Sequence, residues 1–401
     1  MADAGGGSAV PPADIRLLAV ATALPTFSMH VFVPALPAAA LALGVGTAEI
    51  QLSITLYLIG LALGQLVHGP LSDRFGRRPV LLGGLAMYLL GVLIALVAST
   101  LPMLLVGRVL QAVGGCAALV VGRAVVRETL PAAQAAGSLA LLTLAITLSS
   151  ALAPLAGTYL QALAGWRAAF LALLAAGGLI TLMIYRDLPE THQGPRAALD
   201  LRAIGRVLLR LAGQPAFIGY SLGGATATVS VYAFYTALPF LLPEELPRAA
   251  SKIGLIYLTV VAGSVMGALA ARSAARRLPS ERLALAGSLG TVAGALLFLT
   301  GRLLMPDSLA SLVLPLFLLT CSGGFAVPGA ATLAIGVDRT AVGAASSLFG
   351  TIQMTVGAVM TLLVGALGHG STTVGMIVLG SVLAGFAGIL LARSTAARTP
   401  A

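Results

Sequence analysis

The chain is built from long apolar runs, and these limit its fold more than any other feature. Crossing a bilayer takes a helix of about 20 apolar residues. The sequence contains twelve runs of this length. Backbone polar groups find no water in hydrocarbon, so each run is predicted to be a helix, and the runs lack the alternation expected of barrel strands. The predicted spans are 16–38, 50–70, 79–98, 102–124, 136–159, 167–185, 214–236, 252–272, 283–302, 310–335, 341–366 and 372–392.

Composition excludes most other classes of protein. Of 401 residues, 58% are hydrophobic and 9% are charged, whereas a soluble domain carries about 25% charged residues. The two cysteines, Cys116 and Cys321, lie in separate runs, which argues against a disulfide scaffold and a Cys-based zinc site. No Walker motif, nucleotide fingerprint, metal cluster or catalytic triad is apparent. We therefore expect neither an enzyme nor a metal or cofactor, and expect an ion or substrate gradient to supply the energy.

The distribution of basic residues predicts the orientation. The net charge is +10. With twelve spans, 18 Lys and Arg residues fall on the side of both termini and four on the other side, while Arg108 lies within a span. The positive-inside rule then places both termini in the cytoplasm. The basic excess thus indicates orientation in a membrane and not binding of nucleic acid.

The longest polar stretch, 186–213, divides the spans into two sets of six. Short patterns recur at matching places in the two sets: ALP at 35–37 and 237–239, GG at 114–115 and 323–324, and RR at 77–78 and 276–277. Duplicated halves around a midplane site are a transporter architecture. We predict a disordered cytoplasmic N-terminus (1–14), a six-helix half (15–185), a cytoplasmic linker (186–213), a second half (214–393) and a cytoplasmic tail (394–401).

The segment 64–79 reads GQLVHGPLSDRFGRRP. It resembles the signature loop of the major facilitator superfamily, in the form found in the Bcr/CflA drug-resistance subfamily of twelve-span drug:proton antiporters. The resemblance implies an all-α membrane protein of twelve transmembrane helices in two six-helix halves. It also implies a conformational latch, in which the loop acid binds the start of span eleven and a loop arginine pairs with an acid at the end of span four.

On this sequence the latch roles fall on Asp73, Arg77 and Glu128. Small residues let helices approach closely, which is the role expected of Gly64 and Gly69. The other members of the expected latch are Gly76, which permits a tight turn, and the second loop arginine, Arg78. The alternative is that the loop arginines only fix the topology. A single latch is expected, because Arg272 stands at the place of Asp73 in the second half.

Arg108 is the charge inside a span, about 9 Å from the outer surface at 1.5 Å per residue. An intramembrane arginine is costly and suggests a function. The segment 107–115, GRVLQAVGG, resembles the family's fourth-span motif, whose arginine faces the central cavity. Gln111 lies one turn away on the same face. Both residues are candidates to bind a polar or anionic part of a substrate, or to set a neighbour's pKa. The alternative for Arg108 is snorkelling to the interface.

Span one departs from the family pattern. Related exporters carry a proton-binding Asp before Pro-Ala-Leu-Pro, but here the segment 30–37 reads HVFVPALP. His30 therefore replaces the acid at about the depth of Arg108. A histidine can serve as a proton switch because its ordinary pKa is near 6.5. Its interpretation as a proton carrier, its interpretation as a neutral contact to substrate, and simple packing all stay open.

Span five carries a weakened form of the family's antiporter motif, in which Pro154 and Gly157 match. We predict secondary active export of a small amphipathic compound, such as an antibiotic, by proton antiport and alternating access. Export of an endogenous metabolite such as a siderophore, and uptake of a nutrient, are the alternatives. The expected setting is the bacterial inner membrane, with a monomeric chain whose partners are the substrate, protons and the lipid bilayer.

Overall fold

The computed structural model describes residues 14–192, 200–338 and 340–396. Within these ranges the chain is helical, and no strand occurs. Most of the predicted N-terminal segment (1–14), the linker residues 193–199 and the end of the predicted tail (397–401) lie outside the described residues.

Twelve spans in the described residues are long and apolar enough to cross a membrane, which confirms the predicted number. The first span consists of three consecutive helices, because Pro34 and Pro37 interrupt the regular hydrogen bonding. The helices of the first half are α1 (Ile15–Val31), η1 (Val33–Ala35), α2 (Leu36–Leu43), α3 (Thr47–Phe75), α4 (Arg77–Leu96), α5 (Leu101–Thr129), α6 (Ala132–Ala164) and α7 (Arg167–Asp187). Those that follow are α8 (Leu201–Ala212), α9 (Pro215–Glu245), η2 (Pro247–Lys252), α10 (Ile253–Ala274), α11 (Ser280–Leu304), α12 (Ala310–Gly336), α13 (Val342–Leu367) and α14 (Ser371–Ala396).

Several helices extend beyond the predicted spans. The prediction 50–70 corresponds to α3, which continues to Phe75, and 102–124 corresponds to α5, which continues to Thr129. The apolar criterion detects only the part of a helix that crosses hydrocarbon. The polar last turns of α3 and α5 carry Asp73 and Glu128, so the regular backbone of these helices also positions the predicted latch.

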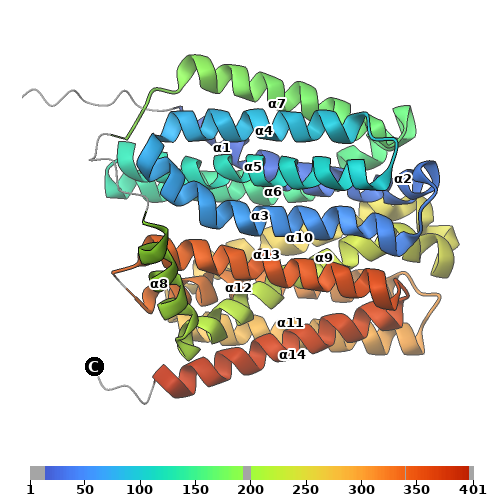
Figure 1. The fold of residues 1–401 in the computed structure, drawn as a ribbon. Helices are drawn as coiled ribbons and strands as arrows, with labels where there is room; N and C mark the ends of the chain where they lie inside the picture. The colour runs from blue at the N-terminus through green and yellow to red at the C-terminus, as the bar shows by residue number, and fades with distance from the viewer. Residues whose placement is uncertain (1–13, 193–199, 339, 397–401) are drawn as a thin grey trace, which may run out of the picture.

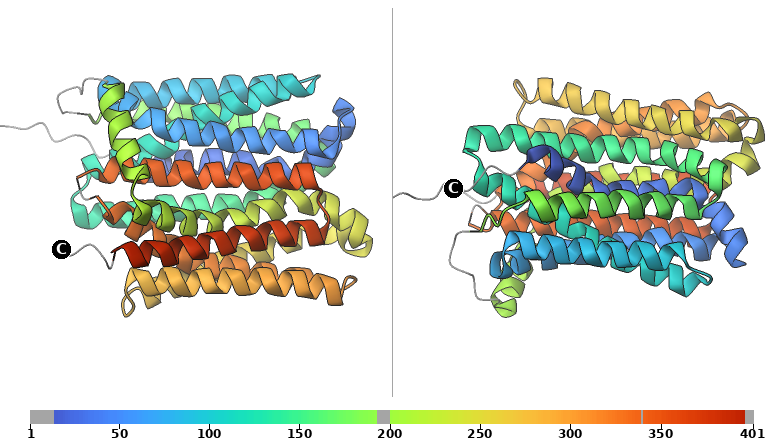
Figure 2. Two further views of the ribbon diagram at one scale, coloured as in Figure 1. Left: turned by 60° about the horizontal axis from the view of Figure 1, so that its bottom comes forward. Right: turned by 90° about the horizontal axis from the view of Figure 1, so that it is seen from above.

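The helices run side by side, with α1–α7 in one group and α9–α14 in the other (Figure 1). The short helix α8 crosses the end of the bundle at which α14 finishes, and the further views in Figure 2 place it at the same end. We call this the linker end. Within the membrane-length segments, 83% of the most apolar stretch of α9 is buried, against 24% for α6 and 28% for α10. α9 is therefore an inner helix, whereas α6 and α10 lie at the periphery of the bundle.

The helix α8 is fixed to the second half. Asp200 caps its first turn by accepting hydrogen bonds from the backbone N–H groups of Arg202 and Ala203, both at 3.0 Å. On its inner face Leu211 is completely buried against α9 and its neighbours. Arg210 forms an ion pair with Asp338, just after α12, at 2.7 Å between Nη2 and Oδ2. The end of the linker thus moves with the second half.

Glycines allow the closest helix contacts in both halves. In the first half, a Cβ added at Gly84 of α4 would collide with Ala117 Cβ and would lie 2.8 Å from Gly114 O of α5. In the second half, a Cβ added at Gly287 of α11 would collide with the backbone at Ala326 of α12. Small residues let membrane helices approach until their backbones touch. The third and fourth spans of each half are therefore joined in the same way.

The contact at Gly84 gives a matched test of this packing. Gly84→Ala is expected to destabilise the protein by about 1–3 kcal/mol, because the new methyl group forces α4 away from α5. The neighbouring Gly83 has open space where its Cβ would stand, so Gly83→Ala is expected to be neutral. Thermal unfolding of the purified variants, followed by circular dichroism, measures the difference. Equal unfolding temperatures for the two variants would contradict close packing at Gly84.

Candidate functional site

Arg108 is completely buried inside the first half. Its guanidinium carbon lies 4.1 Å from the ring centroid of Tyr57 on α3, 5.4 Å from Phe32 at the end of α1, and 5.9 Å from Phe170 on α7. Aromatic faces stabilise a cation by their quadrupole. A snorkelling arginine would place its guanidinium at the membrane surface. Here it points into a cage of three rings, which argues against the snorkelling alternative.

The hydrogen bonds of Arg108 use only one of its nitrogens. Nη1 donates to Gln111 Oε1 at 2.6 Å and to the Ser28 carbonyl of α1 at 3.2 Å. Nε and Nη2 of Arg108 and Nε2 of Gln111 are buried and have no partner among the described residues. Arg108 and Gln111 thus meet on one face of α5, as their spacing predicts, and keep unused donors.

His30 lies on α1, two residues beyond the carbonyl that Arg108 contacts. It is completely buried. Its Nδ1 lies 2.8 Å from the Thr26 carbonyl, which only accepts hydrogen bonds, so the proton of a neutral ring is on Nδ1. Nε2 is left with a lone pair and no partner among the described residues. The structure therefore brings the predicted cavity residues His30, Arg108 and Gln111 to one region, which we call the central polar cluster.

The cluster lies where the two halves meet. The His30 ring packs edge-on against two tyrosines of α9, with centroids 5.6 Å from Tyr232 and 5.0 Å from Tyr235. Tyr235 is buried and Tyr232 is partly buried, and both come from the second half. His30 is thus the member of the cluster that contacts both halves.

Direct hydrogen bonds between the halves lie at mid-depth or toward the end opposite the linker. They join Gln51 Nε2 to the Thr236 carbonyl (3.4 Å), the hydroxyl groups of Thr55 and Thr361 (2.8 Å), and the Thr351 hydroxyl to the Ala62 carbonyl (3.2 Å). Among the described residues, none joins the two halves near the linker end. The halves are therefore held closed on the side away from α8.

At the linker end, the predicted latch residues Asp73, Arg77 and Glu128 form one ionic network. Arg77 Nη1 lies 2.6 Å from Asp73 Oδ1, and Arg77 Nη2 lies 2.6 Å from Glu128 Oε1. Arg77 is nearly buried, so both carboxylates compensate its charge. In the described residues Asp73 makes no polar contact with α13, which carries the start of span eleven. The structure thus contains the pair of Arg77 and Glu128 that the resemblance implies. Within the part of the chain that the structure describes, Asp73 also binds Arg77 and not the start of span eleven.

The small residues of the predicted latch differ in their surroundings. Gly64 lies against Cys116 of α5, whose Sγ would be 3.0 Å from an added Cβ. Gly69 has nothing within 4 Å of that position, so the expected close approach at Gly69 is wrong for this arrangement of the helices. The prediction fails because Gly69 points away from the neighbouring helix, which the residue type alone does not show. Gly76 has φ +100°, as a tight turn requires.

Glu190, which follows α7, belongs to no motif that would single it out in the sequence. Its carboxylate accepts hydrogen bonds from the backbone N–H groups of Arg77 (2.9 Å) and Arg78 (3.2 Å) at the start of α4. It also accepts from the N–H groups of Thr191 and His192, both at 2.9 Å. Burial alone would raise the pKa of the Glu190 carboxyl, but these four donors bring the pKa below its usual value. A carboxylate at a helix N-terminus is stabilised by the unpaired N–H groups there.

Two more predicted residues have clear positions. Arg78 Nη2 donates to the Tyr185 carbonyl of α7 at 2.7 Å, which fixes α4 to α7. Pro154 lies within α6. One turn further, a Cβ added at Gly157 would collide with the Val31 carbonyl of α1. The Pro154–Gly157 turn therefore lies directly against the end of α1, just beyond His30.

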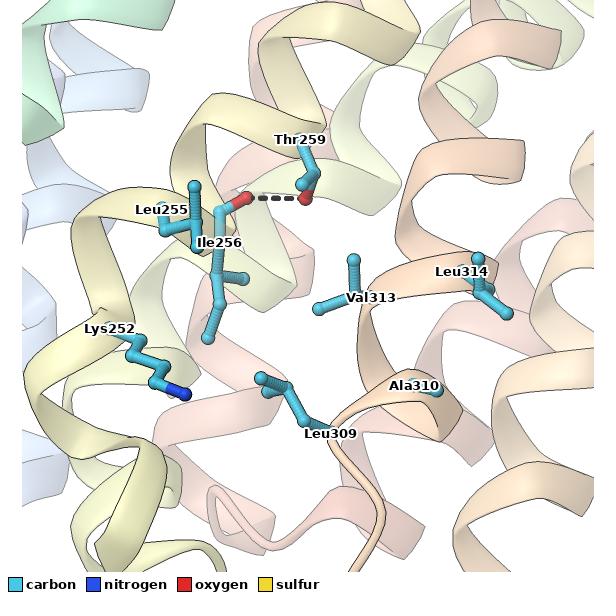
Figure 3. A pocket seen from close by; sticks show the side chains of 8 residues that line it. All are labelled: Lys252, Leu255, Ile256, Thr259, Leu309, Ala310, Val313 and Leu314. Atoms are coloured by element: carbon cyan, nitrogen blue, oxygen red, sulfur yellow. Dashed lines mark hydrogen bonds between the residues drawn. The ribbon is translucent and has the colours of Figure 1, made fainter.

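A separate groove of about 290 Å³ lies between α10 and α12 at the end opposite the linker (Figure 3). Its walls are mostly aliphatic, and Lys252 stands at its edge. The groove contains none of the predicted site residues, and it involves helices of the second half alone. The central polar cluster, and not this groove, is therefore the candidate functional site. The lining residues are Lys252, Leu255, Ile256, Thr259, Leu309, Ala310, Val313 and Leu314.

The Glu190 contact predicts a pH-dependent contribution to stability. A lowered pKa in the folded state means that the ionised carboxylate stabilises the protein above pH about 4.5, and that this contribution is lost as the pH falls through the lowered pKa. Because Glu190 is partly exposed, solvent limits its effect to about 1 kcal/mol. Glu190→Gln is expected to unfold at a lower temperature than the wild type at pH 7, and this difference is expected to disappear as the pH falls through the lowered pKa of Glu190. Asp187→Asn, three residues earlier, is the control, and a pH-independent difference for Glu190→Gln would contradict the prediction.

Comparisons with known proteins agree with this architecture. The sequence pattern of the Major Facilitator Superfamily matches residues 18–361. The chain is 25% identical to a bicyclomycin resistance protein homolog of Haemophilus influenzae, over 88% of this chain and 89% of that protein. It is 30% identical to a chloramphenicol resistance protein of Pseudomonas aeruginosa, over 88% and 84% of the two chains. The inward-open xylose transporter of Escherichia coli superimposes with a TM-score of 0.71 at 15% identity, covering 92% of this chain and 94% of that one. Fold and relatives together confirm the resemblance, and the chain belongs to the Major Facilitator Superfamily, whose members are transporters and not enzymes.

Proposed function

We propose that this protein exports a small amphipathic compound by alternating access, with proton antiport, as a monomer in the bacterial inner membrane with both termini in the cytoplasm. The observation that carries the proposal is the central polar cluster, which is enclosed in the membrane and contacts both halves through His30. The relatives named for resistance to bicyclomycin and chloramphenicol support an antibiotic as the exported compound.

His30 is the proposed proton carrier. Its Nε2 has a lone pair and no partner among the described residues, so it can take up a proton without breaking an existing bond. The ring also packs on Tyr232 and Tyr235 of the other half. Gaining a positive charge there favours solvation, and therefore favours separation of His30 from the tyrosines. Protonation is in this way coupled to opening of the contact between the halves.

Inverted membrane vesicles with an acidic lumen test the function and the role of His30 together. Labelled chloramphenicol or bicyclomycin is expected to accumulate in vesicles containing the wild type, because the lumen corresponds to the outside of the cell. His30→Ala is expected to lose the stimulation by the pH gradient, and His30→Asp to regain it with a shifted pH dependence. His68→Ala is the control, since His68 also bonds a carbonyl one turn earlier, that of Gly64.

The outcomes of the vesicle experiment separate the alternatives. Unchanged pH dependence in both His30 variants would exclude this residue as the carrier. Absence of accumulation for both antibiotics would contradict drug export. Intracellular accumulation of an iron chelator in an iron-starved deletion strain would then identify a siderophore exporter.

Asp73 is the proposed latch acid. In this arrangement it pairs with Arg77, and in the alternative arrangement it is proposed to bind the exposed N–H groups at the start of α13. Asp73→Asn is therefore expected to lower transport at least ten-fold while expression and membrane insertion stay at the wild-type level. Asp307→Asn, an exposed acid at the other end of the bundle, is the control. Wild-type transport rates in Asp73→Asn would overturn the latch.

A further inference from the structure

Arg108 differs from the other buried arginines in having no carboxylate. Arg77 contacts Asp73 and Glu128, and Arg302 contacts Glu245 at 2.8 Å. No ion pair of Arg108 occurs among the described residues. The sequence has 13 Asp and Glu residues, and the 12 of them that the structure describes all lie near helix ends or in connections between helices. The positive charge in the middle of the first half is therefore not neutralised by any carboxylate among the residues that the structure describes.

The unused atoms of the central polar cluster have a common chemistry. Arg108 Nη1 is occupied by Gln111 and the Ser28 carbonyl. Arg108 Nε and Nη2 are buried donors that have no acceptor among the described residues. Nε and Nη2 form one edge of the guanidinium, and this edge matches the two oxygens of a carboxylate or a similar anion. What the cluster lacks is an acceptor with negative charge.

We infer that the exported compounds include organic anions, beside the uncharged antibiotics of the vesicle experiment, and that the anionic group binds the Nε–Nη2 edge of Arg108. This inference rests on the proposed export function and adds the charge of the substrate to it. A cationic compound would meet a like charge and no carboxylate in the membrane. The aromatic side chains that surround Arg108 and His30 suit the apolar part of an amphipathic anion.

The charge of the substrate also fixes how the membrane potential acts. In a cell with a negative interior, a potential of 100 mV favours exit of a monovalent anion by about 50-fold at equilibrium. Proton entry in exchange for the anion adds to this effect. The potential is therefore expected to stimulate export with or without proton antiport.

Binding can be measured separately from transport. The chain has one tryptophan, Trp166, whose ring packs 6.1 Å from Phe170 and 6.4 Å from Phe32. These are two of the three rings around Arg108, so Trp166 emission reports on this region. Three cyclohexylmethyl compounds that differ only in a sulfonate, a sulfonamide or a trimethylammonium group are suitable probes, because none of them absorbs with tryptophan.

The purified full-length protein is titrated with each probe. The sulfonate is expected to change Trp166 emission saturably and to bind at least ten-fold more tightly than the trimethylammonium compound. Arg108→Gln is expected to abolish this preference. Arg108→Lys, which keeps the charge but loses the planar edge, is expected to bind the sulfonate more weakly with the preference retained. Arg123→Gln, on the same helix, is the control and is expected to bind as the wild type does.

Transport of the same probes is measured in proteoliposomes with a potassium diffusion potential. The sulfonate is expected to move toward the positive side faster than either other probe. Tighter binding of the trimethylammonium compound, or no saturable response to the sulfonate, overturns the inference. Sulfonate binding without transport supports the anion site and contradicts the export function. Transport of the cationic probe alone supports export and overturns the inference.

Discussion

The cost of keeping a guanidinium inside hydrocarbon determines how the first half is assembled. An unpaired charge in a medium of low dielectric constant is expensive, and here the compensation comes from several helices at once. α1 contributes a carbonyl, α5 contributes Gln111, and aromatic side chains from α3, α7 and the end of α1 surround the charge. Glycines let these helices approach closely: Gly60 and Gly64 of α3, for example, lie directly against Ala112 and Cys116 of α5. The close packing of the first half and the burial of the Arg108 guanidinium therefore depend on each other.

Much of this arrangement could be predicted from the sequence. The length of the apolar runs gives the twelve spans, and the loop motif gives the pair of Arg77 and Glu128. The spacing of three residues on a helix gives the contact between Arg108 and Gln111. Three features could not be predicted in this way. Glu190 is one of several acids near the linker, and it reaches α4 only because α7 returns the chain to that point. The tyrosines that cover His30 belong to α9, which is distant in sequence. Gly69 faces open space although its neighbour Gly64 is packed. Each of these three features depends on how helices that are distant in the sequence are oriented toward one another. The residues near each position in the sequence do not determine that orientation.

The two ends of the bundle differ in how the halves are connected. Away from the linker, hydroxyl and amide groups join α3 to α9 and α13 across the halves. At the linker end, the ionic network of Asp73, Arg77 and Glu128 is confined to the first half. Hydrogen bonds between the halves at one end and an ionic network confined to one half at the other end fit one state of a rocking transporter. His30, Tyr232 and Tyr235 lie between these two regions. A rearrangement of the helices at either end therefore alters their packing.

The fixed ends of the linker limit how far the halves can separate. Glu190 holds His192 to the start of α4, and Asp200 begins a helix that is bound to the second half through Arg210 and Leu211. Only the residues 193–199 connect these two anchors. A fully extended chain of this length reaches no further than about 28 Å. While the contacts at both anchors persist, the start of α4 and the start of α8 can therefore move apart by no more than this distance.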